Sequence, residues 1–74
     1  MDYNNEIILA CEAGIGELQA IANYTKQLMQ SESDDMKALF ENNRRDELPH
    51  IQNMVIAITA MVNGESPKAA EEVG

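Results

Sequence analysis

The sequence predicts an all-α protein, an antiparallel two-helix hairpin that dimerises into a four-helix bundle. Apolar residues recur at steps of three and four in two long segments, a spacing that is typical of amphipathic helices. A short polar segment rich in helix-capping residues separates them. The chain has 74 residues and one cysteine, so neither a large core nor an internal disulfide can stabilise a lone hairpin.

The first predicted helix covers about residues 5–30, a stretch that contains no proline. Its apolar stripe consists of Ile7, Cys11, Gly14, Ile15, Leu18, Ile21, Thr25 and Leu28. Residues at these spacings share one face of an α-helix, so we expect this face to pack against a second helix. On this interpretation Cys11 is a small, buried apolar side chain.

The second predicted helix covers about residues 34–63. The residues typical of a helix start are Ser31 or Ser33 as the cap and Asp34 and Asp35 in the first turn. Asn63-Gly64 is a typical stop signal. We therefore predict one helical domain at residues 1–64, with a tight turn centred near Glu32, and a disordered polar tail at residues 65–74.

The second helix is apolar on nearly every side near its C-terminal end, from Met54 to Val62. One neighbouring helix cannot cover so wide an apolar surface, so we expect contacts on more than one side. Two hairpins related by a twofold axis give the simplest arrangement, a four-helix bundle. The predicted partner is therefore a second copy, in a homodimer or in a larger even-numbered oligomer.

Charge and hydropathy argue against two classes of partner. Thirteen acidic residues against five basic ones give a net charge of −8, which repels the phosphate backbone of nucleic acids. The longest uninterrupted apolar run, Ile7 to Cys11, is too short to cross a membrane. No basic segment precedes this run, so we expect a cytoplasmic protein, or one enclosed in a protein compartment loaded from the cytoplasm.

The candidate functional residues lie within the apolar stripes. Glu47 and His50 are one turn apart on the inward face of the second helix, where one metal ion can bind both side chains. A buried carboxylate needs such a cation or hydrogen bonds. Glu17 lies fifteen residues before Glu32 at the turn, and Glu47 lies fifteen after it. The two carboxylates should therefore lie at the same level of an antiparallel hairpin.

One hairpin offers two carboxylates and one imidazole, which are too few for a closed site with two metal ions. Two copies offer four Glu and two His, the ligand set of carboxylate-bridged di-metal sites in helical bundles. The sequence therefore predicts Glu17, Glu47 and His50 as metal ligands at a site shared between two subunits. Iron, manganese and zinc all accept these ligands.

The segment from Gly16 to Tyr24 resembles the first-helix signature of rubrerythrin-type proteins in the ferritin-like di-iron carboxylate superfamily. That signature reads Gly-Glu-x-Gln-Ala, with Tyr seven residues after the Glu. Glu47-Leu48-Pro49-His50 resembles the Glu-x-x-His of the second helix in that family. The resemblance covers most of the chain, from about residue 5 to 63, but the rubredoxin-like cysteine pairs of full rubrerythrins are missing. Single-hairpin relatives, notably the encapsulated ferritins, build their bundle across a subunit interface.

The resemblance implies a ferroxidase-type oxidoreductase that binds iron through Glu17, Glu47 and His50 and oxidises Fe(II) with dioxygen or peroxide. Tyr24, two turns from Glu17, and Asn43, one turn before Glu47, are candidates for supporting hydrogen bonds. The resemblance also adds an encapsulin-type shell to the expected partners. The alternative is a non-enzymatic helical assembly module whose metal site is structural, holds zinc or is empty.

Pro49 lies between the two candidate ligands of the second helix. Proline in a helix interior removes one hydrogen bond and clashes with the carbonyl group four residues earlier. The sequence leaves two outcomes open at this point: a kink near the site, or a break in the helix.

Overall fold

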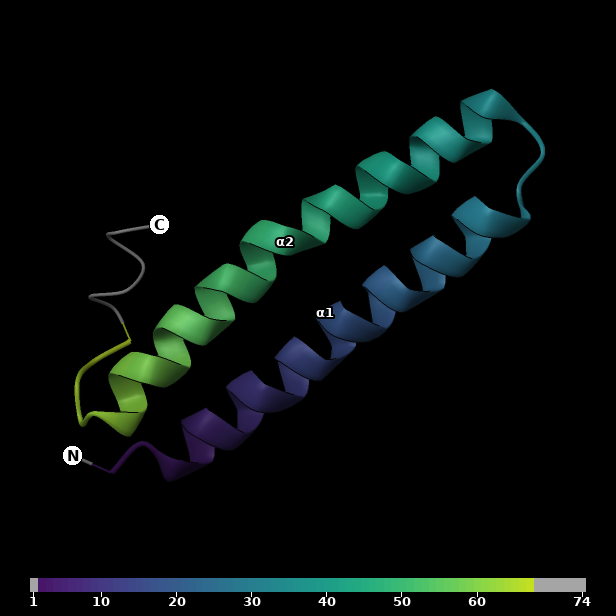
Figure 1. Cartoon of the computed structure of the whole chain (residues 1–74). Helices are drawn as coiled ribbons and strands as arrows, with labels where there is room; N and C mark the ends of the chain where they lie inside the picture. Colours follow the sequence, from purple (N-terminus) through teal and green to yellow (C-terminus); the bar gives the residue numbers. More distant parts are fainter. Residues whose placement is uncertain (1, 68–74) are drawn as a thin grey trace.

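The computed structural model describes residues 2–67. Two α-helices, α1 (Asn4–Gln30) and α2 (Asp34–Val62), run antiparallel and pack side by side as a hairpin (Figure 1). Within these residues there is no β-strand. The predicted all-α hairpin is thus confirmed, and each helix boundary lies within about one residue of its expected position. Neither helix is long and apolar enough to span a membrane.

The ends of α2 follow from the residues that flank it. Ser33 is the N-cap, and its Oγ accepts a hydrogen bond of 3.4 Å from the Met36 N–H. At the other end Gly64 has a positive φ of 78°, a conformation that glycine adopts without steric cost. The chain then turns back so that the Glu65 N–H donates to the Ala60 carbonyl over 2.8 Å. Of the predicted tail, residues 65–67 follow the helix and 68–74 lie outside the described residues.

Pro49 does not break the second helix, because α2 is continuous from Asp34 to Val62. The ring has no N–H to offer, so the Arg45 carbonyl has no α-helical donor at this point. The chain therefore carries an unfavourable residue in the interior of α2, between Glu47 and His50.

The helices meet along a narrow seam. From α1 it includes Ile7, Ala10, Gly14, Glu17, Ile21, Tyr24 and Leu28, all partly exposed. From α2 it includes Phe40, Asn43, Glu47, Ile51, Met54, Ile58 and Met61. Met61, at 5% exposure, is the one buried apolar side chain among the described residues. A single hairpin therefore has almost no closed core.

The expected packing stripe of the first helix is correct only in part. Ile7, Ile21 and Leu28 lie in the seam, but Ile15 and Leu18 are exposed and so is the Cys11 thiol. The reason is geometric: residues spaced alternately by three and four spread over a wider arc than one neighbouring helix covers. The prediction of a buried Cys11 is wrong for the hairpin itself.

Candidate metal centre

Glu17, Glu47 and His50 converge at one level of the hairpin. Glu17 stands in the middle of α1, while Glu47 and His50 project from the same side of α2 one turn apart. One ligand atom from each residue can be chosen so that all three atoms lie within 4.8 Å of one another. Glu17 and Glu47 therefore lie at the same level, as predicted. The short turn joins the two helices at one end, and both helices have the same rise per residue.

The carboxylates lie in the seam and the imidazole lies at its rim. The Glu17 and Glu47 side chains are 23% and 18% exposed, whereas the His50 side chain is 57% exposed. His50 Nδ1 lies 3.3 Å from Glu17 Oε2 and 3.6 Å from Glu47 Oε2. The shorter distance is a hydrogen bond when Nδ1 carries the proton. This contact lies on one broad side of the hairpin, which we call the ligand face.

When Glu47 is protonated, a hydrogen bond joins it to Glu17, and the pKa values of the two carboxyl groups shift in opposite directions. A hydrogen bond from Glu47 lowers the pKa of Glu17, and His50 lowers that pKa further. The same hydrogen bond, together with partial burial and the negative charge of Glu17, raises the pKa of Glu47 above its ordinary value. Two carboxylates this close repel each other when both are ionised, so a cation between them would replace the proton.

The donor set fits a metal ion on chemical grounds. Metal–ligand bonds to Glu and His are about 2 Å long, so two donors to one ion lie at most about 4 Å apart. The distances from His50 Nδ1 to both carboxylates are within this limit. When Nδ1 binds a metal, the proton resides on Nε2, which the exposed position of the ring leaves accessible to solvent. Three protein donors are fewer than the four ligands of a typical site with Glu and His ligands, so the hairpin alone would not complete the coordination of an ion.

Tyr24 and Asn43 were the candidates for supporting hydrogen bonds. Both side chains are partly buried in the seam on the same helices as the ligands. Among the hydrogen bonds of residues 2–67, none joins either side chain to Glu17, Glu47 or His50. Their supporting role remains a prediction.

One polar contact across the seam was not predicted from the sequence. Arg44 Nη1 donates to Thr25 Oγ1 over 3.4 Å, and the Thr25 hydroxyl itself donates to the Ile21 carbonyl over 2.7 Å. The position of Thr25 within the apolar stripe, at the seam edge, was the available signal.

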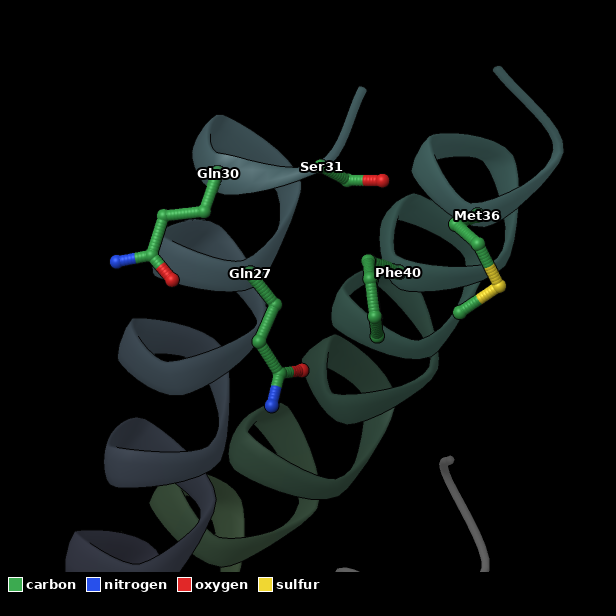
Figure 2. A pocket seen from close by; sticks show the side chains of 5 residues that line it. All are labelled: Gln27, Gln30, Ser31, Met36 and Phe40. Atoms are coloured by element: carbon green, nitrogen blue, oxygen red, sulfur yellow. The ribbon is translucent and has the colours of Figure 1, made fainter. Parts of the chain in front are cut away.

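A shallow groove of about 280 Å³ lies near the turn, away from the three candidate ligands. Figure 2 shows the side chains that line it, from both helices: Gln27, Gln30, Ser31, Met36 and Phe40. The nearest of these to the ligands along α2, Phe40, precedes Glu47 by two turns, or about 10 Å. The groove contains no charged or metal-binding side chain and is not part of the centre.

Comparison with models of protein families, with curated proteins and with solved structures gives no significant match. The class of site therefore rests on the geometry of Glu17, Glu47 and His50.

Proposed function

We propose that this hairpin is half of a ferroxidase-type di-iron protein, with the complete site formed by two copies. The observation that carries the proposal is the convergence of Glu17, Glu47 and His50 at one level of the seam. Glu17 comes from α1, and Glu47 and His50 come from α2, with His50 33 residues after Glu17 in the sequence. Together they supply half of the four-Glu, two-His ligand set of di-iron carboxylate bundles. The resemblance to rubrerythrin-type signatures involves the same three residues.

The position of the site along the hairpin supports a symmetric dimer. Glu17 is the middle residue of α1 (Asn4–Gln30), and Glu47 is within one residue of the middle of α2 (Asp34–Val62). A twofold axis through the site, perpendicular to the helices, therefore leaves both hairpins overlapping along their full length. Such a dimer brings two sets of Glu17, Glu47 and His50 together, and neither end of a hairpin extends beyond its partner.

The composition of the ligand face also suits a close neighbour. Ala13 and Ala20 lie four residues before and three residues after Glu17, and Ala57 lies seven residues after His50. At these spacings the alanines share the ligand face with Glu17 and His50. Such small side chains allow the backbones of neighbouring helices to approach closely. Exposed Leu39, on the same side of α2 as His50, gains burial when a second hairpin covers this face.

In this proposal iron is both the resident metal and the substrate. Bound iron supplies one-electron redox chemistry, and the protein supplies the charge that favours the ferric state. Two Fe(II) ions lose one electron each, and either dioxygen with two protons forms hydrogen peroxide, or peroxide with two protons forms two waters. Glu17 and Glu47 stabilise the increased positive charge, since a carboxylate attracts Fe(III) more strongly than Fe(II).

The second candidate is the helical assembly module with a structural site, which the same donors support because zinc and manganese also accept Glu and His. Redox turnover separates the two. A structural site binds metal and raises stability without consuming an oxidant, whereas the proposed site consumes peroxide or dioxygen in proportion to Fe(II). The expected encapsulin-type shell belongs to the first candidate alone, as a compartment that stores the oxidised iron.

The experiment adds Fe(II) to metal-free protein without oxygen, then adds oxygen or peroxide and follows near-ultraviolet ferric absorbance. The wild type should oxidise iron faster than buffer, and Glu47→Gln should reduce the rate to that of buffer. Glu12→Gln is the matched control, because it removes an exposed carboxylate of α1 and should leave the rate unchanged. Equal rates for wild type and Glu47→Gln would overturn the proposal.

A further inference from the structure

Within residues 2–67, polar side chains join α1 to α2 at two places along the seam. One is the candidate metal centre, where His50 Nδ1 lies 3.3 Å from Glu17 Oε2. The other is the hydrogen bond from Arg44 Nη1 to Thr25 Oγ1. Arg44 and His50 are six residues apart in α2, which falls well short of two full turns, so the two side chains leave the helix on different sides. The two contacts therefore lie on opposite edges of the seam, and together they oppose rotation of one helix against the other.

The apolar contacts between the helices restrict this rotation only weakly. Met61 is the one buried apolar side chain among the described residues, and it lies in the last turn of α2, away from Thr25 and Arg44. Apolar attraction is non-directional, so half-buried side chains allow several rotated arrangements of similar energy. A hydrogen bond requires its donor and acceptor at a set distance and angle. The Arg44–Thr25 bond therefore restricts the rotation more than the apolar contacts around it.

The Thr25 hydroxyl is arranged to accept a hydrogen bond from α2. It donates its own proton to the Ile21 carbonyl over 2.7 Å, so only its lone pairs remain for another partner. The half-buried Arg44 guanidinium has donors only, and it reaches the Thr25 oxygen over 3.4 Å. Ile21 lies one turn after Glu17 in α1. Arg44 lies one turn before Glu47 in α2, so the bond connects the two segments that carry the carboxylates.

We propose that Arg44 and Thr25 are positioning residues of the metal centre, and that their hydrogen bond sets the helix rotation at which the three candidate ligands converge. The inference rests on the proposed function only in that a divalent metal binds these ligands. It does not depend on which metal is bound or on the consumption of an oxidant. Without the bond, fewer molecules have all three ligands in place, and the apparent affinity for the metal falls by that fraction.

The charge of Arg44 separates a positioning effect from an electrostatic one. A cation one turn from Glu47 repels a metal ion, so the loss of its charge alone would strengthen metal binding. The loss of a positioning contact weakens binding instead. Thr25 carries no charge, so its replacement shows the positioning effect without an opposing electrostatic effect.

The test measures Co(II) binding to metal-free protein by calorimetry and by the visible absorption of the bound ion, which depends on its coordination geometry. Thr25→Val removes the hydroxyl at nearly constant shape, and Arg44→Met removes the donor but keeps a long side chain. We expect each variant to bind Co(II) about tenfold more weakly, the lower end of the loss when residues that orient metal ligands are replaced. The double variant should lose little more, because both changes remove the same bond. Thr25→Ser keeps the hydroxyl and should restore the wild-type affinity and spectrum.

The chain offers a matched control for each substitution. Arg45→Met removes the neighbouring guanidinium, which bonds to Glu41 within α2 over 2.8 Å. Thr59→Val removes a hydroxyl that donates to the Val55 carbonyl over 2.8 Å, the same type of bond as that from Thr25 to its own helix. Neither control should weaken Co(II) binding. Circular dichroism should show the wild-type helix content in every variant.

The outcomes distinguish this proposal from the proposed function. Wild-type or stronger Co(II) binding in both Arg44→Met and Thr25→Val would overturn the positioning role. An equal loss in the two controls would also overturn it, since the effect would then come from general stability. If the wild type binds Co(II) but does not oxidise Fe(II), and the two variants bind Co(II) more weakly, the proposed function fails and the positioning role stands. A wild type that binds no Co(II) would overturn both.

Discussion

Replacement of Pro49 by alanine should stabilise the protein. Pro49 lies inside α2, which continues for more than three turns on either side of it. The ring removes one helical hydrogen bond and crowds the carbonyl of Arg45. Pro49→Ala restores an N–H at position 49, directly facing that carbonyl, and relieves the crowding without altering the seam, because Pro49 is exposed.

The expected gain follows from two opposing effects. Proline in a helix interior costs about 3 kcal/mol relative to alanine. It also restricts the unfolded chain, an effect that favours the native proline by about 0.4–1 kcal/mol where the conformation permits. The net gain for Pro49→Ala is therefore about 2 kcal/mol, which corresponds to a rise in Tm of about 8–16 °C for a domain of this size.

Thermal unfolding followed by far-ultraviolet circular dichroism measures this gain in metal-free protein at one fixed chain concentration, because the Tm of an oligomer depends on concentration. Asn53→Ala is the matched control, since Asn53 lies on an exposed part of α2 and its replacement gains helix propensity alone, about 0.5 kcal/mol. A Tm for Pro49→Ala no higher than that of Asn53→Ala would refute the reasoning. It would mean that the surroundings of Pro49 already compensate for the missing hydrogen bond.

Three further predictions concern the ligands and the turn. The raised pKa of Glu47 means that the protonated carboxyl group stabilises the metal-free fold at low pH, and that this stabilisation is lost as the pH rises through that pKa. Glu47→Gln keeps a hydrogen-bond donor to Glu17 without the second negative charge, so it should raise the metal-free Tm at neutral pH. A metal ion must displace the proton of Glu47, so the affinity for Fe(II) should increase as the pH rises through the raised pKa of Glu47 and then level off. Anaerobic calorimetry measures this affinity, and an affinity that does not change with pH would exclude competition between the metal and the proton. Ser33→Ala removes the N-cap of α2 and should lower the unfolding free energy by about 0.5–1 kcal/mol. This is the smaller end of the usual range, because the hydrogen bond from the Met36 N–H is 3.4 Å long. Urea denaturation measures the change, and an unchanged midpoint would contradict the prediction.

The helices and the level of the centre were predictable because they depend on local signals. Ser33 and Asn63-Gly64 set the ends of α2, and the capping groups act over a few residues only. The coincidence in level of Glu17 and Glu47 needed only a tight turn and the fixed rise of an α-helix. Both inferences required no knowledge of side-chain packing.

The division of apolar residues between the seam and the exposed sides of the hairpin was not predictable from spacing alone. Cys11, Ile15 and Leu18 have the same periodicity as Ile7 and Ile21, and which of them meets α2 depends on how the helices rotate relative to each other. Arg44 and Thr25 mark that rotation through a contact between residues nineteen apart. The 57% exposure of His50 depends on the same rotation, which places the imidazole at the rim of the seam.

The measurement that tests the central claim most directly is an anaerobic Fe(II) titration of the metal-free protein with the molecular mass determined at each step. The account predicts saturation at two irons per two chains, a mass of at least two chains at saturation, and loss of iron binding in both Glu17→Gln and Glu47→Gln. Failure to saturate, or saturable binding that persists in those variants or occurs on a single chain, would contradict a centre built from two half-sites.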